Sequence, residues 1–339
     1  MEPPAVVKNG AWEYSLRKMP RPPVPPPDLI LLGPQRLRPT LGEAMAALGT
    51  EGPVAAITAG WQDSEAEDEE LREHLGARTV NLELYRRAEE LFADDARLLA
   101  GHRRRQDSLR DLQDIYRRRL RHAMAAAREL LAEPGDSQLL DQARRDAIAA
   151  VRRLDAEHLE AVRRIHRRFR REVRPDRRAG LRRQRAELSR LLSGCEALAI
   201  AGGHVAVLLN RLRLFDVLYL AGQRPILAWS AGAMALAERV VVFHDSPPQG
   251  AGDAEVLETG LGRLRGLLPF PHARRRLRLR DPLRVRLLAE RFAPATCVAL
   301  DEGDYLTHGD NGWTAEAPAR RLTGSGEVAT FVGPLEAAD

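Results

Sequence analysis

The stretch PILAWSAGAMALAE at residues 225–238 decides the fold. An apolar run ends at Trp229, small residues follow at once, and helix-forming residues continue the chain. A strand that leads directly into a helix is the repeating unit of parallel α/β sheets. The same order occurs upstream, where ALAIAGG at 197–203 precedes VAVLLNRLRLF at 205–215. We therefore predict the α/β fold class, with a mostly parallel sheet flanked by helices.

Other short apolar runs extend this pattern to both ends of the chain. A run of four to seven apolar residues bounded by turn residues is typical of a buried strand. The predicted strands of this kind cover 29–33, 54–60, 197–203, 225–229 and 240–243, with another beginning near 79. Three later runs, at 297–301, 305–308 and 327–331, are expected to complete the edge of the same sheet.

Helices are predicted between the strands. Residues 41–48 favour a helix that stops at Gly49, because glycine accommodates the left-handed conformation at helix ends. Asp63 and Ser64 are expected to cap a second helix over 65–75, whose acidic first turns suit the helix dipole.

The chain changes character between residues 84 and 193. Apolar residues recur there at spacings of three and four, with one strong break at 134–136, which predicts two long helices and a shorter one. This segment holds 29 Arg, no Lys and 18 acidic residues, a net charge of +11 in a chain of +5. The predicted organisation is a Pro-rich tail at 1–28, a discontinuous catalytic domain at 29–83 and 194–335, and an Arg-rich helical insertion at 84–193.

Composition excludes several classes of protein. No basic region precedes an apolar run near the start, and no run reaches about 18 apolar residues, so we expect a cytoplasmic protein without a membrane span. Cys195 and Cys297 have no neighbouring Cys or His cluster, which favours reduced thiols and no metal site. Lys8 and Lys18 are the only lysines, and this preference for arginine is what GC-rich codon usage produces, so the charge argues weakly for nucleic acid.

Ser230 is the candidate nucleophile. It stands where the strand turns into the helix, and the small residues after it permit a sharp turn that lifts the hydroxyl above the carboxyl edge of the sheet. The amide of Ala231 would then point towards a developing oxyanion. The alternative is that Ser230 only caps the helix, which is a common role for serine.

A serine nucleophile needs a base and preferably an acid behind it. His272, which follows the Pro-bounded apolar run LLPFP, is the candidate base, although an isolated histidine is more often structural. Asp245 follows a predicted strand and is the candidate orienting acid; its alternative role is to form a turn before Pro247. Gly203 ends another strand and offers a second oxyanion amide, or else simply makes a tight turn.

Together these segments resemble the dipeptidase E and cyanophycinase family of serine peptidases. The resemblance covers IAGGHVAVLL at 200–209, WSAGA at 229–233, GLGRLRGLLPFPH at 260–272, VALDEGDYL at 298–306 and LTGSGEV at 322–328. It implies a fold like that of class I glutamine amidotransferases, with serine in place of the cysteine nucleophile. It also implies Ser230 as nucleophile, His272 as base and Asp245 as acid, with no cofactor.

This sequence departs from the family around the substrate. His204 and Val205 follow the glycines where the family has Asn or an acidic residue with Gln, so His204 is a candidate substrate contact. Ala273 and a run of arginines from Arg274 follow the histidine in place of the usual aromatic residue, and the Arg274 guanidinium can pair with a carboxylate bidentately. The family's substrates are peptides with an aspartyl residue at the cleaved bond. A peptide or small amide is the expected substrate, although acidic residues at 253–258 would suit a basic one.

The helical insertion has two interpretations. Its apolar spacing predicts an antiparallel arm that packs on itself, on the domain or on a second subunit in a homodimer. The arginines at 163–178 are also able to contact phosphates, but interspersed acidic residues and few aromatics make nucleic acid the less favoured partner. The alternative function is a catalytically silent relative whose arm binds a protein or nucleic acid.

Overall fold

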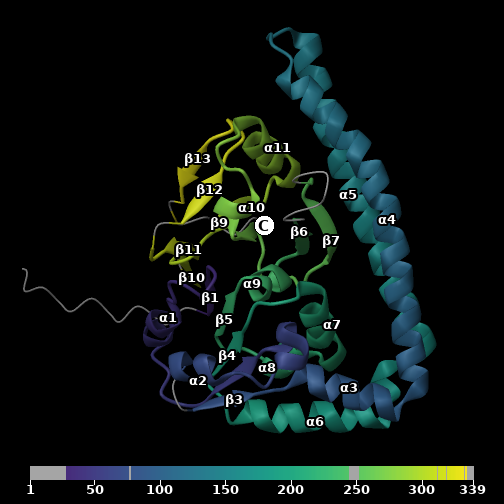
Figure 1. The fold of residues 1–339 in the computed structure, drawn as a ribbon, viewed down its shortest axis with the longest axis vertical. Helices are drawn as coiled ribbons and strands as arrows, with labels where there is room; N and C mark the ends of the chain where they lie inside the picture. The colour runs from purple at the N-terminus through teal and green to yellow at the C-terminus, as the bar shows by residue number, and fades with distance from the viewer. Residues whose placement is uncertain are drawn as a thin grey trace, which may run out of the picture.

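A computed structural model describes residues 28–75, 78–243, 252–310, 312–317, 319–331 and 333. Most of the predicted Pro-rich tail, and the candidate acid Asp245, lie outside these residues. The described part has the predicted α/β fold, with a parallel-rich sheet, flanking helices and a long helical insertion (Figure 1). No helix in these ranges is both long enough and apolar enough to cross a membrane.

The main sheet has seven strands in the order β11-β10-β1-β5-β4-β2-β3. The five strands from β1 to β3 in this order are parallel, and β10 and β11 add an antiparallel edge. The strands are β1 (Leu29–Leu32), β2 (Val54–Ile57), β3 (Thr79–Asn81), β4 (Ala197–Ile200), β5 (Ile226–Trp229), β10 (Tyr305–Gly309) and β11 (Gly312–Ala315).

Alternate residues of the central strands belong to two apolar cores, one on each face of the sheet. In β1, Leu29 and Leu31 join the core that also holds the insertion, whereas Ile30 and Leu32 join the core beneath α1 (Leu41–Leu48) and α2 (Glu69–Leu75). Such double coverage requires aliphatic residues at every position of a strand. It explains why these strands are recognisable as continuous apolar runs.

The second predicted helix begins later than expected. Ala59–Ser64 forms the 3₁₀ helix η1, and α2 starts only at Glu69. The Glu65 carboxylate instead accepts hydrogen bonds from the amides of Tyr85 and Arg86, at 3.0 and 2.9 Å, in the first turn of the following helix α3. Glu65 therefore caps a neighbouring helix, and the prediction that 65–75 is one helix is wrong.

The C-terminal strands form two further sheets. β8 (Leu267–Pro271), β9 (Thr296–Leu300), β12 (Arg320–Leu322) and β13 (Val328–Thr330) make a four-stranded sheet, and β6 (Arg239–Val242) pairs with β7 (Glu255–Thr259). Of the three late runs expected at the main sheet edge, only 305–308 lies there. The helix α11 (Pro282–Phe292) lies between β8 and β9 in the chain and allows them to pair as parallel neighbours. Because β9 pairs with β8, it belongs to the second sheet.

The remaining helices lie at the strand ends and in the insertion. α7 (Val205–Phe215), α9 (Ala231–Leu236) and α10 (Ala273–Arg276) follow strands, and α8 (Val217–Ala221) follows α7. The insertion contains α3 (Leu84–Asp94), α4 (Ala96–Ala132), α5 (Gln138–Val173), the 3₁₀ helix η2 (Pro175–Arg177) and α6 (Ala179–Ser193), which is one α-helix and one 3₁₀ helix more than predicted. Asp95 ends α3 and caps α4 by accepting a hydrogen bond from the Leu98 amide at 2.9 Å.

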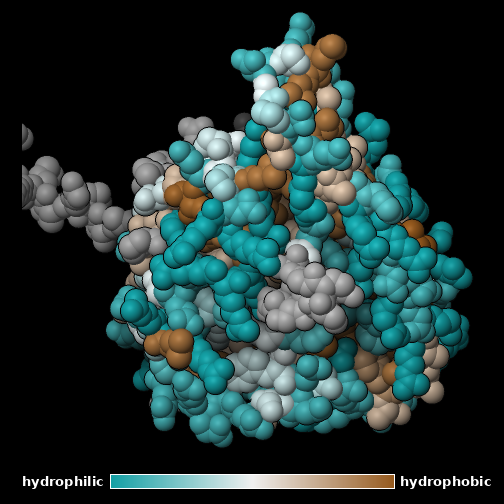
Figure 2. All heavy atoms as spheres, turned by 45° about the horizontal axis from the view of Figure 1, so that its top comes forward, coloured by the Kyte–Doolittle hydropathy of each residue, from teal (hydrophilic) through white to brown (hydrophobic). Residues whose placement is uncertain are grey.

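The antiparallel pair α4 and α5 forms an arm that runs along the body and projects beyond it (Figure 1). The arm is joined to the body by a buried cluster in which Arg291 of α11 donates to both carboxylate oxygens of Asp155, at 2.7 and 2.8 Å. Arg291 also donates to the Tyr116 hydroxyl at 2.9 Å. Figure 2 shows apolar side chains at the projecting end on an otherwise largely hydrophilic face; Leu139 in this region is 85% exposed.

Candidate active site

Ser230 occupies a strained turn between β5 and α9. Its backbone has φ 49° and ψ −119°, a conformation that a residue with a side chain rarely adopts. Its half-buried side chain forms no capping hydrogen bond with α9, although Ser230 holds the N-cap position. The helix-cap interpretation is therefore not supported, and the serine hydroxyl has no structural task in the first turn of α9.

Two glycines allow this turn to sit tightly on β4. A Cβ at Gly232 would lie 2.3 Å from the Ile200 carbonyl oxygen, so a larger residue cannot stand there without displacing the backbone. A Cβ at Gly202 would lie 2.9 Å from the Ser230 Cβ and 3.7 Å from the Ala231 nitrogen. The bare backbone of Gly202 thus leaves the space beside the serine and the Ala231 amide open.

Gly203 and His204 form the turn into α7. Gly203 has φ 103° and is exposed, and its contact with Gly60 leaves no room for a Cβ. The His204 amide donates to the Gly60 carbonyl at 2.7 Å, and within the described ranges no backbone carbonyl accepts the Gly203 amide. The His204 ring is exposed and its Nδ1 accepts from the Val207 amide at 3.3 Å, which makes it the cap of α7.

His272 follows β8 in the second sheet. Its backbone is left-handed, with φ 57°, and its amide donates to the Leu300 carbonyl at 2.9 Å. The side chain is half-buried. Helix α9, which begins beside Ser230, packs on β8. The helix that follows the serine and the strand that precedes the histidine are therefore direct neighbours.

The ends of four strands meet near these residues. β1 pairs with β5 so that Leu32 faces Trp229, which places Gly33 beside Ser230 in register. β8 pairs with β9 so that Pro271 faces Leu300, which places Asp301 beside His272. Gly33 brings the end of β1 against the chain that follows β9. A Cβ at Gly33 would lie 1.7 Å from the Asp301 carbonyl oxygen, and the Gly33 amide donates to the Asp304 carbonyl at 2.9 Å.

Asp301 organises the histidine side of the site. Its buried carboxylate accepts a hydrogen bond from the Arg274 amide at 3.0 Å and is paired with Arg320. The Arg274 Nε lies 3.8 Å from the same carboxylate, and its side chain is 75% exposed. The Asp304 carboxylate accepts the Asp301 amide at 2.7 Å, and burial raises the pKa of Asp304 to about 6.

Sequence reasoning missed Asp301, Asp304 and Arg320. The sequence offered one signal, the motif DEGD at 301–304 directly after an apolar run. Polar side chains at the carboxyl end of a strand often belong to a binding site. Arg320 comes from β12, and no local pattern indicates that it reaches Asp301.

Asp245 itself is not described, but the chain approaching it is. Phe243 packs edge-to-face on Phe270, with ring centroids 5.3 Å apart. Phe270 stands two residues before His272, and Phe243 stands two residues before Asp245. The last described residues before the candidate acid therefore lie against the strand that ends at the candidate base.

The two cysteines are not among the residues of this site. Cys195 and Cys297 are free and buried, and burial raises the pKa of both thiols, that of Cys297 to about 12. Over the residues that the structure describes, no group of three or more His, Cys, Asp or Glu side chains is placed to hold a metal ion.

Comparison with known proteins finds similarity at the level of structure. No protein-family model matches the chain, and no curated protein matches it. Among solved structures, the chain is similar to a peptidase from an acI-B1 actinobacterium, with 15% sequence identity and a TM-score of 0.44. The similarity covers 89% of this chain and 96% of that one.

Proposed function

We propose that this protein is a serine hydrolase that cleaves a peptide or related amide bond. Ser230 is the nucleophile, His272 the general base and Asp245 the acid that orients the histidine. The observation that carries the proposal is the strained backbone of Ser230, with φ 49°, combined with a side chain that caps nothing. Strain of about 1–3 kcal/mol at one residue persists where the surrounding structure enforces it, and such residues cluster at active sites.

The proposed reaction proceeds through an acyl-enzyme. His272 takes the proton of the Ser230 hydroxyl as the oxygen attacks the carbonyl carbon, and the carbonyl oxygen becomes an oxyanion. The amides of Gly203 and Ala231 are the proposed donors to that oxyanion. The protonated histidine then gives its proton to the leaving amine, which leaves an acyl group on Ser230. Water, deprotonated by His272, next attacks this ester and releases the carboxylic acid and the free serine.

We assign the protein to the dipeptidase E and cyanophycinase family as part of this proposal, with peptides that carry an aspartyl residue as the first substrates to test. Arg274 and His204 are the proposed substrate contacts. Both side chains are exposed, and the Arg274 amide is fixed on Asp301, so its guanidinium can turn towards a substrate carboxylate without disturbing the backbone.

Hydrolysis of a small aspartyl peptide set tests the function. We expect the native protein to release free amine from at least one peptide, and Ser230→Ala to lose this activity by a factor of about 10⁴ or more. Ser193→Ala is the matched control, because Ser193 is exposed and its hydroxyl donates to the Arg190 carbonyl of its own helix.

Two outcomes would contradict the proposal. Hydrolysis that survives in Ser230→Ala at the native rate would remove the serine from the mechanism. Failure of the native protein to cleave any amide would favour the catalytically silent alternative, in which the arm serves a binding partner.

A further inference from the structure

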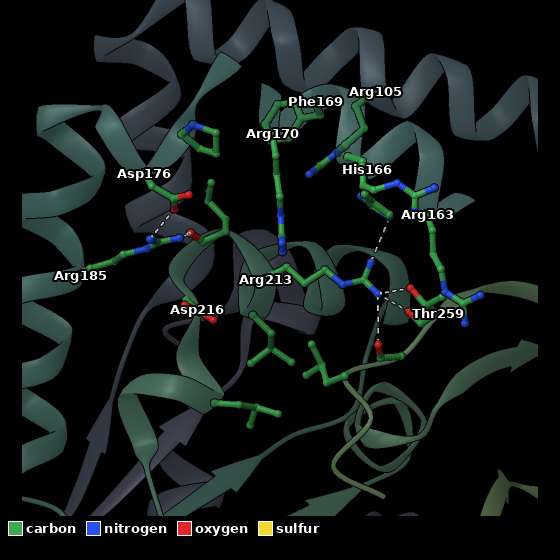
Figure 3. Close-up of a pocket in the computed structure, with 17 residues that line it drawn as sticks. Arg105, Arg163, His166, Phe169, Arg170, Asp176, Arg185, Arg213, Asp216 and Thr259 are labelled. Carbon is green, nitrogen blue, oxygen red and sulfur yellow. Dashed lines mark hydrogen bonds and ion pairs between the residues drawn. The ribbon is translucent and has the colours of Figure 1, made fainter. Parts of the chain in front are cut away.

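A cavity of about 520 Å³ lies where the arm joins the body, away from the candidate active site. Helices α4, α5, α6 and α7 and the end of β7 form its walls (Figure 3). Arg213, in the last turn of α7, lines it, whereas the first turn of that helix adjoins Gly203. Arg213 stands eight residues after Val205, so the two places are about 12 Å apart along the helix.

The cavity wall is strongly cationic. Six arginines line it, and they come from four different helices: Arg105, Arg163, Arg167, Arg170, Arg185 and Arg213. Figure 3 shows Arg105, Arg170 and Arg213 pointing towards one another across the cavity. Asp176 and Asp216 are the acidic residues of the lining, and Asp176 is already paired with Arg185 at 2.7 Å.

Two of the converging arginines have no carboxylate partner in the described part of the chain. Arg105 donates to the amide oxygen of Asn210 at 2.5 Å, and its guanidinium lies 4.4 Å from the Phe169 ring centroid. Arg170 forms no ion pair with any described carboxylate. Arg213, by contrast, is paired with Glu258 and donates to the Thr259 hydroxyl at 2.8 Å.

Burial makes the charges of Arg105 and Arg213 costly, whereas the Arg170 side chain is exposed. Arg105 is 9% exposed, and its Nε is a buried donor with no partner among the described residues. Burial and the neighbouring Arg211 and Arg170 lower the pKa of Arg105 to about 10. Burial, Arg105 and Arg170 lower the pKa of Arg213 to about 9. Buried charges in folded proteins are normally paired, so an anion at this place would satisfy groups that the chain itself leaves unsatisfied.

We propose that this cavity binds a small molecule that carries two or more phosphoryl groups. Guanidinium groups form bidentate hydrogen bonds with phosphate oxygens, and three of them converging from separate helices fit a ligand with several negative groups. The volume is within the usual range for small-molecule sites and exceeds the need of a single phosphate ion. Leu212, Leu214 and Leu261 also line the cavity and offer apolar contacts to an organic part.

Thermal unfolding with defined anions tests the proposal. At constant ionic strength and without divalent metal, we expect ATP and tripolyphosphate to raise Tm by about 5 °C at 100 times Kd. Adenosine should give no shift. Tighter binding of ATP than of tripolyphosphate would identify a nucleotide-like ligand, and equal binding an inorganic oligophosphate.

Two matched variants locate the site. Arg170→Gln should weaken ATP binding by about tenfold or more, because it removes a charge-assisted contact. Its Tm without ligand should equal or exceed that of the native protein, since repulsion with Arg105 and Arg213 is relieved. Arg164→Gln makes the same charge change at an exposed position of α5 outside the cavity and should bind as the native protein does.

The proposal is overturned if neither ATP nor tripolyphosphate shifts Tm at millimolar concentration. It is also overturned if Arg170→Gln binds both compounds as tightly as Arg164→Gln, because the cavity would then not be the site. Neither result depends on hydrolysis at Ser230, so the two proposals fail independently.

Discussion

Replacing His272 by Ala is expected to slow hydrolysis at Ser230 by about 10²–10⁴-fold, the range attributed to a positioned general base. The serine hydroxyl is a weak nucleophile until its proton is removed, and His272 directly follows the strand against which the helix after Ser230 packs. The measurement is the initial rate of amine release from the best aspartyl peptide, with folding checked by circular dichroism.

A second histidine supplies the control for this experiment. His74 lies in α2, where its Nδ1 is 2.7 Å from the Glu70 carbonyl oxygen, and His74→Ala should keep the native rate. Added imidazole should restore part of the activity of His272→Ala, because a small base can enter the space left by the ring. A rate unchanged by His272→Ala would show that this residue is not the base.

Asp155→Ala is expected to lower the free energy of unfolding by about 3–5 kcal/mol, the cost of leaving a buried charge without its partner. The Arg291 side chain is 0% exposed and that of Asp155 is 2% exposed, so water cannot replace the lost carboxylate. Urea unfolding followed by circular dichroism measures the change.

Two further variants separate this effect from a general loss of charge. Glu157→Ala breaks a pair with Arg119 whose side chains are 49% and 57% exposed, and should cost less than about 1 kcal/mol. The double variant Asp155→Leu with Arg291→Met removes both buried charges and should recover most of the stability. A small effect of Asp155→Ala alone would mean that this cluster does not join the arm to the body.

The main sheet was predictable because each of its central strands is buried on both faces. Leu29–Leu32 and Ile226–Trp229 contain apolar residues at every position, and no surface helix reproduces such a pattern. The second sheet was not predictable, because 297–301 and 305–308 are both short strand-like runs and their partners are distant in the chain. The delayed start of α2 has a similar cause, since the role of Glu65 depends on the amides of Tyr85 and Arg86.

The candidate site, too, was only partly predictable from the sequence. Ser230 was recognisable because a strand, a sharp turn of small residues and a helix follow one another locally. The contacts of Asp301 with Gly33, Arg274 and Arg320 join segments that the sequence keeps far apart. The cationic cavity is the extreme case, because the arginines are evident in the sequence but their convergence depends on the packing of four helices.

The most direct test of the central claim is to treat the native protein with a fluorophosphonate and locate the adduct by mass spectrometry of its peptides. A serine nucleophile activated by a histidine forms a covalent phosphonyl ester, which an ordinary serine does not. We predict one adduct, on Ser230, that is absent in Ser230→Ala and retained in Ser193→Ala. An adduct on another residue, or equal labelling of the native protein and Ser230→Ala, would contradict the assignment of Ser230 as the nucleophile.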